Sequence, residues 1–399
     1  MNKVRVDLLN KNSVDDITSI YNTAFCSQNL DSLLESLTDD EKMLSFMYGL
    51  HEDDVICGVH AIVPSEVRIR KKSSKSLYLD YVAVSPQYRG RKHGRTLLID
   101  AFERARKQNI PFVMMQPFRH SFYKSAGFAS ALDNYCVEIN TELLKKSRND
   151  GRIPVNSAII QKDPQIVDKL FEIKKRLFDF NSANDLLMQK YWYNWIKYSD
   201  YELAYVDQED SFGYLIYQND TKNKSIAVQE FRWSDRDSFC ALAKYLMNFK
   251  YYAKQISFES VPGDFLIDFF IDDYWNQNDS VAFTYYPIRM VRIVDVFKAI
   301  EDVVDYSNLD CPFSITIDDS LIDENNNTYQ LSRNGCKVLE KVDTCDLRLG
   351  IEDFAYLLTG KYSIYDLEYL NNTYYQSREV LERINQCFPK TATWSSSIL

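Results

Sequence analysis

Long apolar segments are missing from this sequence. No stretch approaches the roughly 20 consecutive apolar residues that a helix needs to cross a bilayer, although 45% of the 399 residues are hydrophobic. The first residues, MNKVRVDLLNKNSVDD, carry charges where an export signal would have an apolar run. We therefore expect a cytoplasmic protein with packed cores and no membrane partner.

Clustered metal ligands are missing as well. The chain has eight cysteines and four histidines, and no two cysteines form a C-x-x-C pair. Thiols in the cytosol stay reduced, so we expect no disulfides. Because no group of cysteines and histidines has the spacing of a zinc site, we also expect no metal.

Positive charge is in deficit over the chain as a whole. There are 47 Lys and Arg against 57 Asp and Glu, which gives a formal net charge of −10. Such a chain repels nucleic acid and attracts cationic ligands, so we expect no nucleic-acid partner. The sign of the charge reverses in one short stretch, between Arg89 and Arg95.

Apolar residues in the first third follow both helical and strand periods. Ser13, followed by two aspartates, is typical of a helix start. The pattern predicts helices at 13–25, 31–43 and 94–107, and strands at 45–52, 55–63, 77–84, 111–117 and 134–139. It also predicts a turn at 71–76 and a brief helix at 122–128 that ends at Gly127.

The pattern restarts twice further along the chain. After residue 154 it predicts a helix near 187–196, strands at 211–218, 225–233 and 255–261, and a helix at 235–249. No basic, glycine-containing loop precedes that last helix. After Met290 it predicts a helical stripe to Val303, a strand at 313–318, turns at 325–335 and a helix ending at Gly360. We therefore expect three domains, 1–149, 150–287 and 288–399.

The most specific pattern is VAVSPQYRGRKHGRTLL, residues 82–98. Five of the seven residues from Arg89 to Arg95 are Arg, Lys or His, and they lie between an apolar strand and an amphipathic helix. A helix N-terminus exposes unpaired N–H groups and partial positive charge, so a loop there can bind an anion. Gly90 and Gly94 let the backbone approach a ligand closely. This favours a cofactor pyrophosphate site over the alternative, a solvated basic turn.

This segment resembles the acetyl-CoA loop of the GNAT superfamily of N-acetyltransferases, whose consensus is Q/R-x-x-G-x-G/A. Arg89 matches its first position and Gly94 its last, while Lys92 replaces the middle glycine. The segment FYKSAGF, residues 122–128, resembles the Y-x-x-x-G-F segment that follows the cofactor-binding strand in this superfamily.

Over nearly the whole chain, the organisation is similar to the Eis-like branch of the superfamily. That branch has a catalytic GNAT domain, a degenerate second GNAT domain and a domain similar to sterol carrier proteins. MVRIVD at 290–295 and LLTG at 357–360 carry the likeness in the last domain. The implied fold class is α/β (α+β), with tandem GNAT-like mixed sheets and flanking helices plus a small C-terminal α+β sterol-carrier-like domain. A homo-oligomer, trimer or hexamer, is also implied.

The resemblance implies acetyl-CoA as the acetyl donor and assigns residues to it. Those expected to bind it are Val82, Ala83, Val84, Arg89, Gly90, Arg91, Lys92, His93, Gly94 and Arg95. The N–H of Val84 would stabilise the oxyanion, and Tyr123 would protonate the departing thiolate. In this branch the base is the chain's terminal carboxylate, here that of Leu399; a frayed terminus is the alternative, and His120 is another candidate base.

The implied function is transfer of an acetyl group to a primary amine in a ternary complex. The acceptor would be a polycationic small molecule, such as an aminoglycoside, or the lysine side chain of a peptide. Four acidic residues either line an acceptor pocket or form a solvated face: Asp31, Asp39, Asp40 and Glu41. Two other functions stay open, a non-catalytic acyl-CoA or lipid binding protein and an acyltransferase with another acyl donor.

Overall fold

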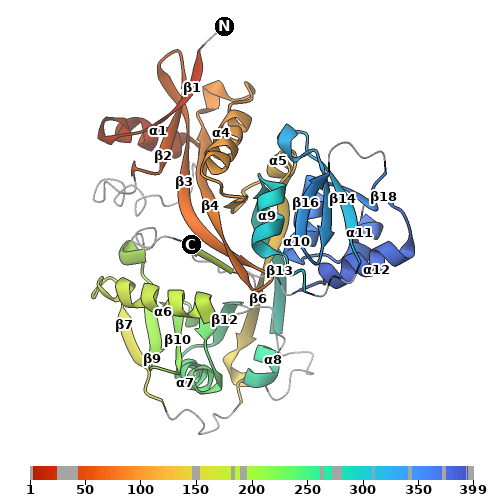
Figure 1. The fold of residues 1–399 in the computed structure, drawn as a ribbon. Coiled ribbons are helices and arrows are strands. Elements are labelled where there is room, and N and C mark those ends of the chain that lie inside the picture. The colour runs from red at the N-terminus through yellow and green to blue at the C-terminus, as the bar shows by residue number, and fades with distance from the viewer. Residues whose placement is uncertain are drawn as a thin grey trace. The chain divides into compact units, whose positions relative to one another are not determined.

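The chain folds into two compact units in the computed structural model, shown in Figure 1. The structure describes residues 3–24, 44–145, 153–180, 185–188, 196–260, 265–271, 281–307, 309, 311–339, 344–370, 374–391 and 393. Unit 1 combines Met1–Leu132 with Arg289–Thr393, and unit 2 contains Asp133–Ile288. The first and last thirds of the chain therefore fold together. Among the described residues, no helix is long and apolar enough to cross a membrane.

The first sheet of unit 1 has the strand order β1–β2–β3–β4–β5–β13. Its strands are β1 (Val4–Leu8), β2 (Met47–Glu52), β3 (Val55–Ile69), β4 (Lys72–Val84), β5 (Phe112–Met115) and the end of β13 (Val281–Ile293). Neighbours are antiparallel except β4 and β5, which are parallel and joined by a helical crossover. The strand predictions are confirmed for β2 to β5, whereas β1 was not predicted.

Among the described residues, the helices that accompany this sheet are α1 (Val14–Ala24), α4 (His93–Lys107) and α5 (His120–Lys124). α4 lies alongside β3 and β4 (Figure 1). It buries the apolar stripe that its sequence predicts, which includes Leu98 and Phe102, against Leu77 and Val113 of the sheet. The helix predicted at 31–43 lies outside the described residues.

The C-terminal part of unit 1 forms a second sheet in the order β16–β15–β14–β17–β18. Its strands are β14 (Phe313–Asp318), β15 (Thr328–Ser332), β16 (Gly335–Leu339), β17 (Leu347–Gly350) and β18 (Tyr374–Tyr375). Its helices are α9 (Val296–Val303), α10 (Ile351–Thr359), α11 (Ile364–Leu370) and α12 (Arg378–Cys387). α9 packs against β4 of the first sheet and β16 of the second.

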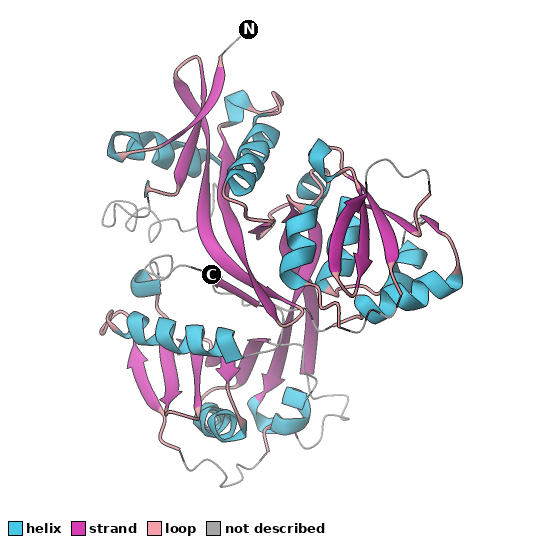
Figure 2. Ribbon diagram, in the orientation of Figure 1, coloured by secondary structure: helices cyan, strands magenta, loops and turns pink. Residues whose placement is uncertain are grey.

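Unit 2 contains a sheet in the order β6–β12–β11–β10–β9–β7, with helices flanking it (Figure 2). Its strands are β6 (Ala129–Asn140, from Asp133 onward), β7 (Asn156–Ile159), β9 (Glu202–Asp207), β10 (Phe212–Asp220), β11 (Ser225–Trp233) and β12 (Gln255–Ser260). Other elements are the short strand β8 (Asp185–Met188), α6 (Ile166–Phe180), α7 (Arg236–Met247) and α8 (Phe265–Phe270). A core cluster of apolar residues between α7 and these strands supports the unit.

Three local predictions were wrong. Residues 71–76 are mostly strand, because β3 and β4 are one long hairpin that turns at Arg70 and Lys71. The serines of this polar run are satisfied across the strands, as in the 2.7 Å contact of Ser65 with Ser76. Within the range 325–335, β15 stands where turns were predicted. Leu187 and Met188 lie in β8 rather than in a helix, since apolar spacing in a short segment fits either period.

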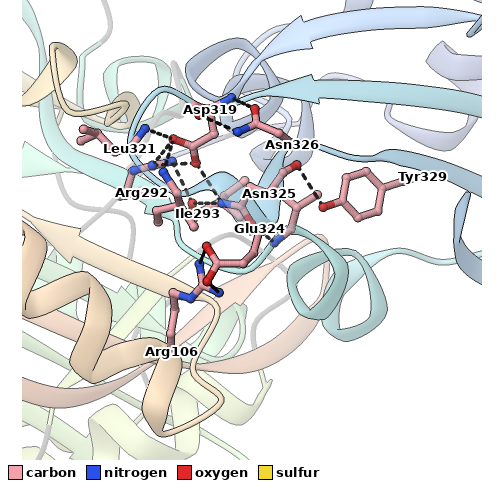
Figure 3. Close-up of polar contacts among 11 residues, drawn as sticks. Arg106, Arg292, Ile293, Asp319, Leu321, Glu324, Asn325, Asn326 and Tyr329 are labelled. Atoms are coloured by element: carbon pink, nitrogen blue, oxygen red, sulfur yellow. Dashed lines mark hydrogen bonds and ion pairs between the residues drawn. The ribbon is translucent and has the colours of Figure 1, made fainter. Parts of the chain in front are cut away.

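A buried ion pair joins the two parts of unit 1. Arg292 of β13 donates to both carboxylate oxygens of Asp319 at 2.7 Å, and the exposed fractions of the two side chains are 0% and 1%. Asp319 also accepts hydrogen bonds from the N–H groups of Leu321 and Ile322 and from the side chain of Asn325 (Figure 3). Burial lowers the pKa of Arg292, and the nearby carboxylate opposes that effect. Near this cluster, Arg106 of α4 pairs with Glu324.

We expect Asp319→Ala to destabilise unit 1 by about 3–5 kcal/mol, because it leaves a buried guanidinium without its counter-charge. The matched control is the adjacent Asp318→Ala, which removes an exposed pair with Arg348 at 2.7 Å. That loss should cost less than about 1 kcal/mol. Denaturant unfolding of the full chain measures both effects. Equal shifts of the two unfolding midpoints would show that the buried pair contributes no more to stability than the exposed pair.

Candidate active site

An irregularity in β4 opens the edge of the first sheet. The parallel pairing of β4 with β5 ends at Tyr78, while β4 continues to Val84 on β3 alone. A bulge follows, in which Tyr81 has a φ of 51°. Beyond the bulge, the N–H of Ser85 donates to Cys57 at 2.9 Å. Because hydrogen-bonded and non-bonded positions alternate in an antiparallel pair, the N–H of Val84 points away from β3.

The loop after β4 brings unpaired backbone N–H groups to the start of α4. A 3₁₀ turn at Pro86–Tyr88 leads into it, and Gly90 has a φ of 81°. Lys92 is the N-cap of α4 with a φ of 64° and makes no capping hydrogen bond with its side chain. Lys92 thus keeps the left-handed backbone that a glycine would adopt. The first N–H groups of α4 and the positive end of its dipole are left for an anion.

A cavity of about 680 Å³ lies between this loop and the segment around α5. Among the described residues, its lining includes nine of the ten residues predicted to bind the cofactor: Val82, Ala83, Val84, Arg89, Gly90, Lys92, His93, Gly94 and Arg95. Phe118, Phe122, Ser125 and Ala126 contribute from the opposite wall. The remaining predicted residue, Arg91, does not line it.

Two of the five basic side chains of the loop are held by a carboxylate. Glu52 of β2 contacts Arg91 at 2.8 Å and His93 at 2.7 Å. His93 and Glu52 are both buried, so the imidazole faces the carboxylate rather than a phosphate. The cationic side chains that line the cavity from this loop are then those of Arg89, Lys92 and Arg95. The sequence pattern did not predict the role of Glu52, which lies far from the loop in the chain.

Tyr123 is buried in α5 within an aromatic cluster. Its ring packs edge-to-face against Phe118, Phe122 and Phe128 at centroid distances of 5.8, 5.0 and 5.8 Å. Burial raises the pKa of Tyr123, so its hydroxyl stays protonated at neutral pH. Tyr123 is not among the described residues that line the cavity, but its neighbours Phe122 and Ser125 are.

Asp80 is a titratable residue that the sequence analysis did not select. It immediately precedes the bulge of β4, and its carboxylate accepts the N–H of Tyr81 at 2.8 Å. Burial raises the pKa of Asp80 to about 6, and its charge in turn raises the pKa of Tyr123. The signal was available in the sequence, because an acid interrupts the otherwise apolar strand LYLDYVAV.

The other predicted site residues are placed as follows. His120 is the first residue of α5. Leu399, and the four acids at 31–41 that could face an acceptor, lie outside the described residues.

The expected absence of a metal stays a prediction. Glu52, Cys57 and His93 bring three possible ligand atoms within 4.8 Å of one another. Burial, however, raises the pKa of the Cys57 thiol to about 11.

Comparisons with known proteins agree with this geometry. Residues 5–131 match the model "Acetyltransferase (GNAT) domain", and residues 188–293 match a second model with the same description. Residues 296–396 match the model "Sterol carrier protein domain". A search of the curated proteins gives no match.

Solved structures share the fold at low sequence identity. A GCN5-related N-acetyltransferase from Anabaena variabilis is 15% identical with a TM-score of 0.83, covering 98% of this chain and 99% of its own. A probable N-acyltransferase from Enterococcus faecalis is 17% identical with a TM-score of 0.84 and full coverage of both chains, 100% each. Eis1 from Mycobacterium abscessus is 15% identical with a TM-score of 0.78, covering 98% of each chain. With two GNAT domains followed by a sterol carrier protein domain, the chain is a tandem GNAT protein, and it shares its fold with Eis1.

Proposed function

We propose that this protein is an N-acyltransferase that moves an acetyl group from acetyl-CoA to a primary amine. The observation that carries the proposal is the cavity between the free edge of β4, the basic loop before α4 and the wall near Tyr123. An acyl-CoA needs an anion site for its pyrophosphate and a strand edge for its pantetheine arm. The N-terminus of α4 fits the first need, and the part of β4 beyond its pairing with β5 fits the second.

The loop would bind the cofactor mainly through its backbone. The unpaired N–H groups at the start of α4 would donate to the pyrophosphate oxygens, and Lys92 and Arg95 would add charge for a further phosphate. Glu52 would hold Arg91 and His93 away from the phosphates. These two side chains would then fix the loop to β2 instead of binding the cofactor. Acetyl-CoA would serve as the acetyl donor and co-substrate.

The reaction we propose is direct attack of a neutral amine on the thioester carbonyl. The ammonium form of the acceptor first gives one proton to a base, which leaves the neutral amine, and the N–H of Val84 stabilises the oxyanion that forms on attack. When the intermediate collapses, the C–S bond breaks and the nitrogen loses a second proton, which ends on the sulfur. Tyr123 would donate a hydrogen bond to that sulfur. The pKa of a tyrosine hydroxyl exceeds that of a thiol, so proton transfer from Tyr123 to a free thiolate would be unfavourable. Tyr123 therefore takes the second proton from the nitrogen at the same time as the sulfur takes the proton of Tyr123.

Three groups could accept the first proton. The α-carboxylate of Leu399 is the base that the Eis-like resemblance implies. Asp80 and His120 are candidates within the described residues, and the pKa of Asp80, about 6, lets it accept a proton near neutral pH. The net charge of −10 favours a cationic acceptor, either a polyamine-like small molecule or a lysine side chain.

The resemblance further leads us to propose a cytosolic homo-oligomer, a trimer or hexamer, whose mass light scattering would measure.

Thiol release from acetyl-CoA across a panel of polycations and lysine-containing peptides tests the proposed function. We expect turnover with at least one amine, and Tyr123→Phe should lower kcat by roughly 10²–10³-fold. The matched control is Tyr217→Phe, which removes the hydroxyl of a buried tyrosine in unit 2. A chain extended by a few residues after Leu399 should lose turnover if the terminal carboxylate is the base.

The outcomes of that panel separate the alternatives. Turnover only with another acyl-CoA would identify a different acyl donor. Binding of acetyl-CoA by calorimetry without turnover on any amine would favour a binding protein. Silence in both measurements would overturn the proposal. Full activity of the extended chain would keep the enzyme and remove Leu399 from the mechanism.

Lys92→Ala should weaken CoA binding by roughly 5- to 20-fold, or about 1–2 kcal/mol, the net contribution of one hydrogen bond. Arg91→Ala is the matched control, because it removes a neighbouring charge that faces Glu52 instead of the cavity. We expect Arg91→Ala to change affinity by less than about threefold. Calorimetry with CoA measures both variants. An equal loss in the two would mean that only the total charge of the loop matters.

Asp80→Asn should change the pH dependence of turnover. In the parent protein kcat/KM should fall as pH drops through about 6, because the protonated acid cannot accept a proton. The variant should lose this inflection, with a rate roughly 10²-fold lower at neutral pH. Folding raises the pKa of Asp80, so protonation of Asp80 adds to the free energy of unfolding at pH 4, and this contribution is lost by pH 7. The unfolding midpoint of the variant should not show this loss. A retained inflection would exclude Asp80 as the base.

A further inference from the structure

Helix α10 of the C-terminal domain lies against the segment that carries Tyr123. Lys124 of α5 pairs with Glu352, in the first turn of α10, at 3.3 Å. One turn later, the hydroxyl of Tyr356 accepts the N–H of Ser130 at 3.2 Å. The same hydroxyl donates to Glu352 at 3.2 Å. A continuous chain of polar contacts thus leads from β6 through α10 to the residue next to Tyr123.

Between these two attachments, the backbone touches α10 directly. Gly127 has a φ of 80°, and a Cβ there would lie 2.8 Å from a methyl carbon of Ile351. Only a glycine fits both the left-handed backbone and this close approach. Lys124, Gly127 and Ser130 therefore fix the segment 124–130 to α10 at its start, middle and end.

Ser125 of this segment lines two cavities, the one of about 680 Å³ and a second of about 810 Å³. The second cavity is also bordered by Lys124, Gly127, Glu352 and Tyr356. Other residues of the segment, Ala126 and Phe128, are buried in the core of unit 1. The contacts with α10 therefore add polar and steric support where the segment borders the second cavity.

α10 is in turn fixed at its other end by the catalytic domain. Arg70, at the turn of the β3–β4 hairpin, donates to the carbonyls of Leu357 and Leu358 at 2.8 and 2.7 Å. These carbonyls belong to the last turn of the helix, where that of Leu357 also accepts the N–H of Gly360 at 3.1 Å. The helix therefore spans between the β3–β4 hairpin and the α5–β6 segment, both of which belong to the first domain.

We propose that α10 of the sterol carrier protein domain positions Tyr123 for its interaction with the departing sulfur, and that Glu352 and Tyr356 are positioning residues. This inference rests on the proposed function. Group transfer depends steeply on geometry, and a displacement of about 1 Å can cost 10²-fold in rate. Through α10, the C-terminal domain then takes part in catalysis with residues that do not themselves touch the substrate.

Tyr356→Phe and Glu352→Gln test the proposal in the full chain. We expect each to lower kcat, Tyr356→Phe by roughly tenfold, while the dissociation constant for CoA changes less than twofold. The same domain supplies matched controls. Tyr375 donates to Glu368 at 2.8 Å, so Tyr375→Phe and Glu368→Gln remove the same kind of contact away from α10. The controls should keep the parent kcat. Equal losses of kcat in test and control variants, or no loss in either, would overturn the proposal.

Hydrogen–deuterium exchange of residues 123–130 gives a readout that does not depend on turnover. In Tyr356→Phe the N–H of Ser130 loses its acceptor, so exchange across this segment should become faster than in Tyr375→Phe. If the parent protein turned over no amine, the proposed function would fail, and exchange alone would decide whether α10 holds the segment. Unchanged exchange in Tyr356→Phe would overturn the positioning role.

Discussion

The ion pair of Arg292 with Asp319 is the constraint on which the architecture of unit 1 depends. A buried guanidinium needs a counter-charge, and Asp319 is held in place for that purpose by hydrogen bonds from Leu321, Ile322 and Asn325. Arg292 lies on β13, which pairs with β5 of the first sheet. The pair therefore fixes the place where the last third of the chain joins the first. The Cζ of Arg292 also lies 3.1 Å from where a Cβ of Gly127 would be, so Arg292 contacts the segment 124–130 as well.

Sequence reasoning succeeded where the site is continuous in the chain. Strand, loop and helix follow one another over residues 82–98, and the period of their apolar residues locates each element. A loop between a strand and a helix N-terminus must present its N–H groups near the strand end, whatever the rest of the fold does. For this reason most of the predicted cofactor residues do line one cavity. The left-handed backbone of Lys92 shows that the loop keeps its shape without the middle glycine.

The errors arose where a partner distant in the chain decides the outcome. Nothing near Arg91 and His93 indicates that Glu52 holds them, so a pattern of five basic residues overstated the charge available to a phosphate. The polar run after Lys71 has the composition of a turn. It is strand because Ser76 bonds to Ser65 across the hairpin and Ser74 donates to Asp302 of α9 at 2.6 Å. Asp80 was visible as an acid in an apolar strand, but its raised pKa follows from burial that only the fold shows.

The two GNAT domains differ most at the start of one helix. In the first domain, the N-cap of α4 is Lys92, which makes no capping bond with its side chain, so the N–H groups and the dipole of α4 are left for an anion. In the second, α7 follows β11 and its N-cap is Asp235, whose carboxylate accepts the N–H of Ser238 at 2.8 Å in a capping box. A carboxylate there both uses the N–H groups and repels a phosphate. The second domain thus gains a more stable helix where the first keeps an anion site. This difference favours anion binding at the first of the two helices.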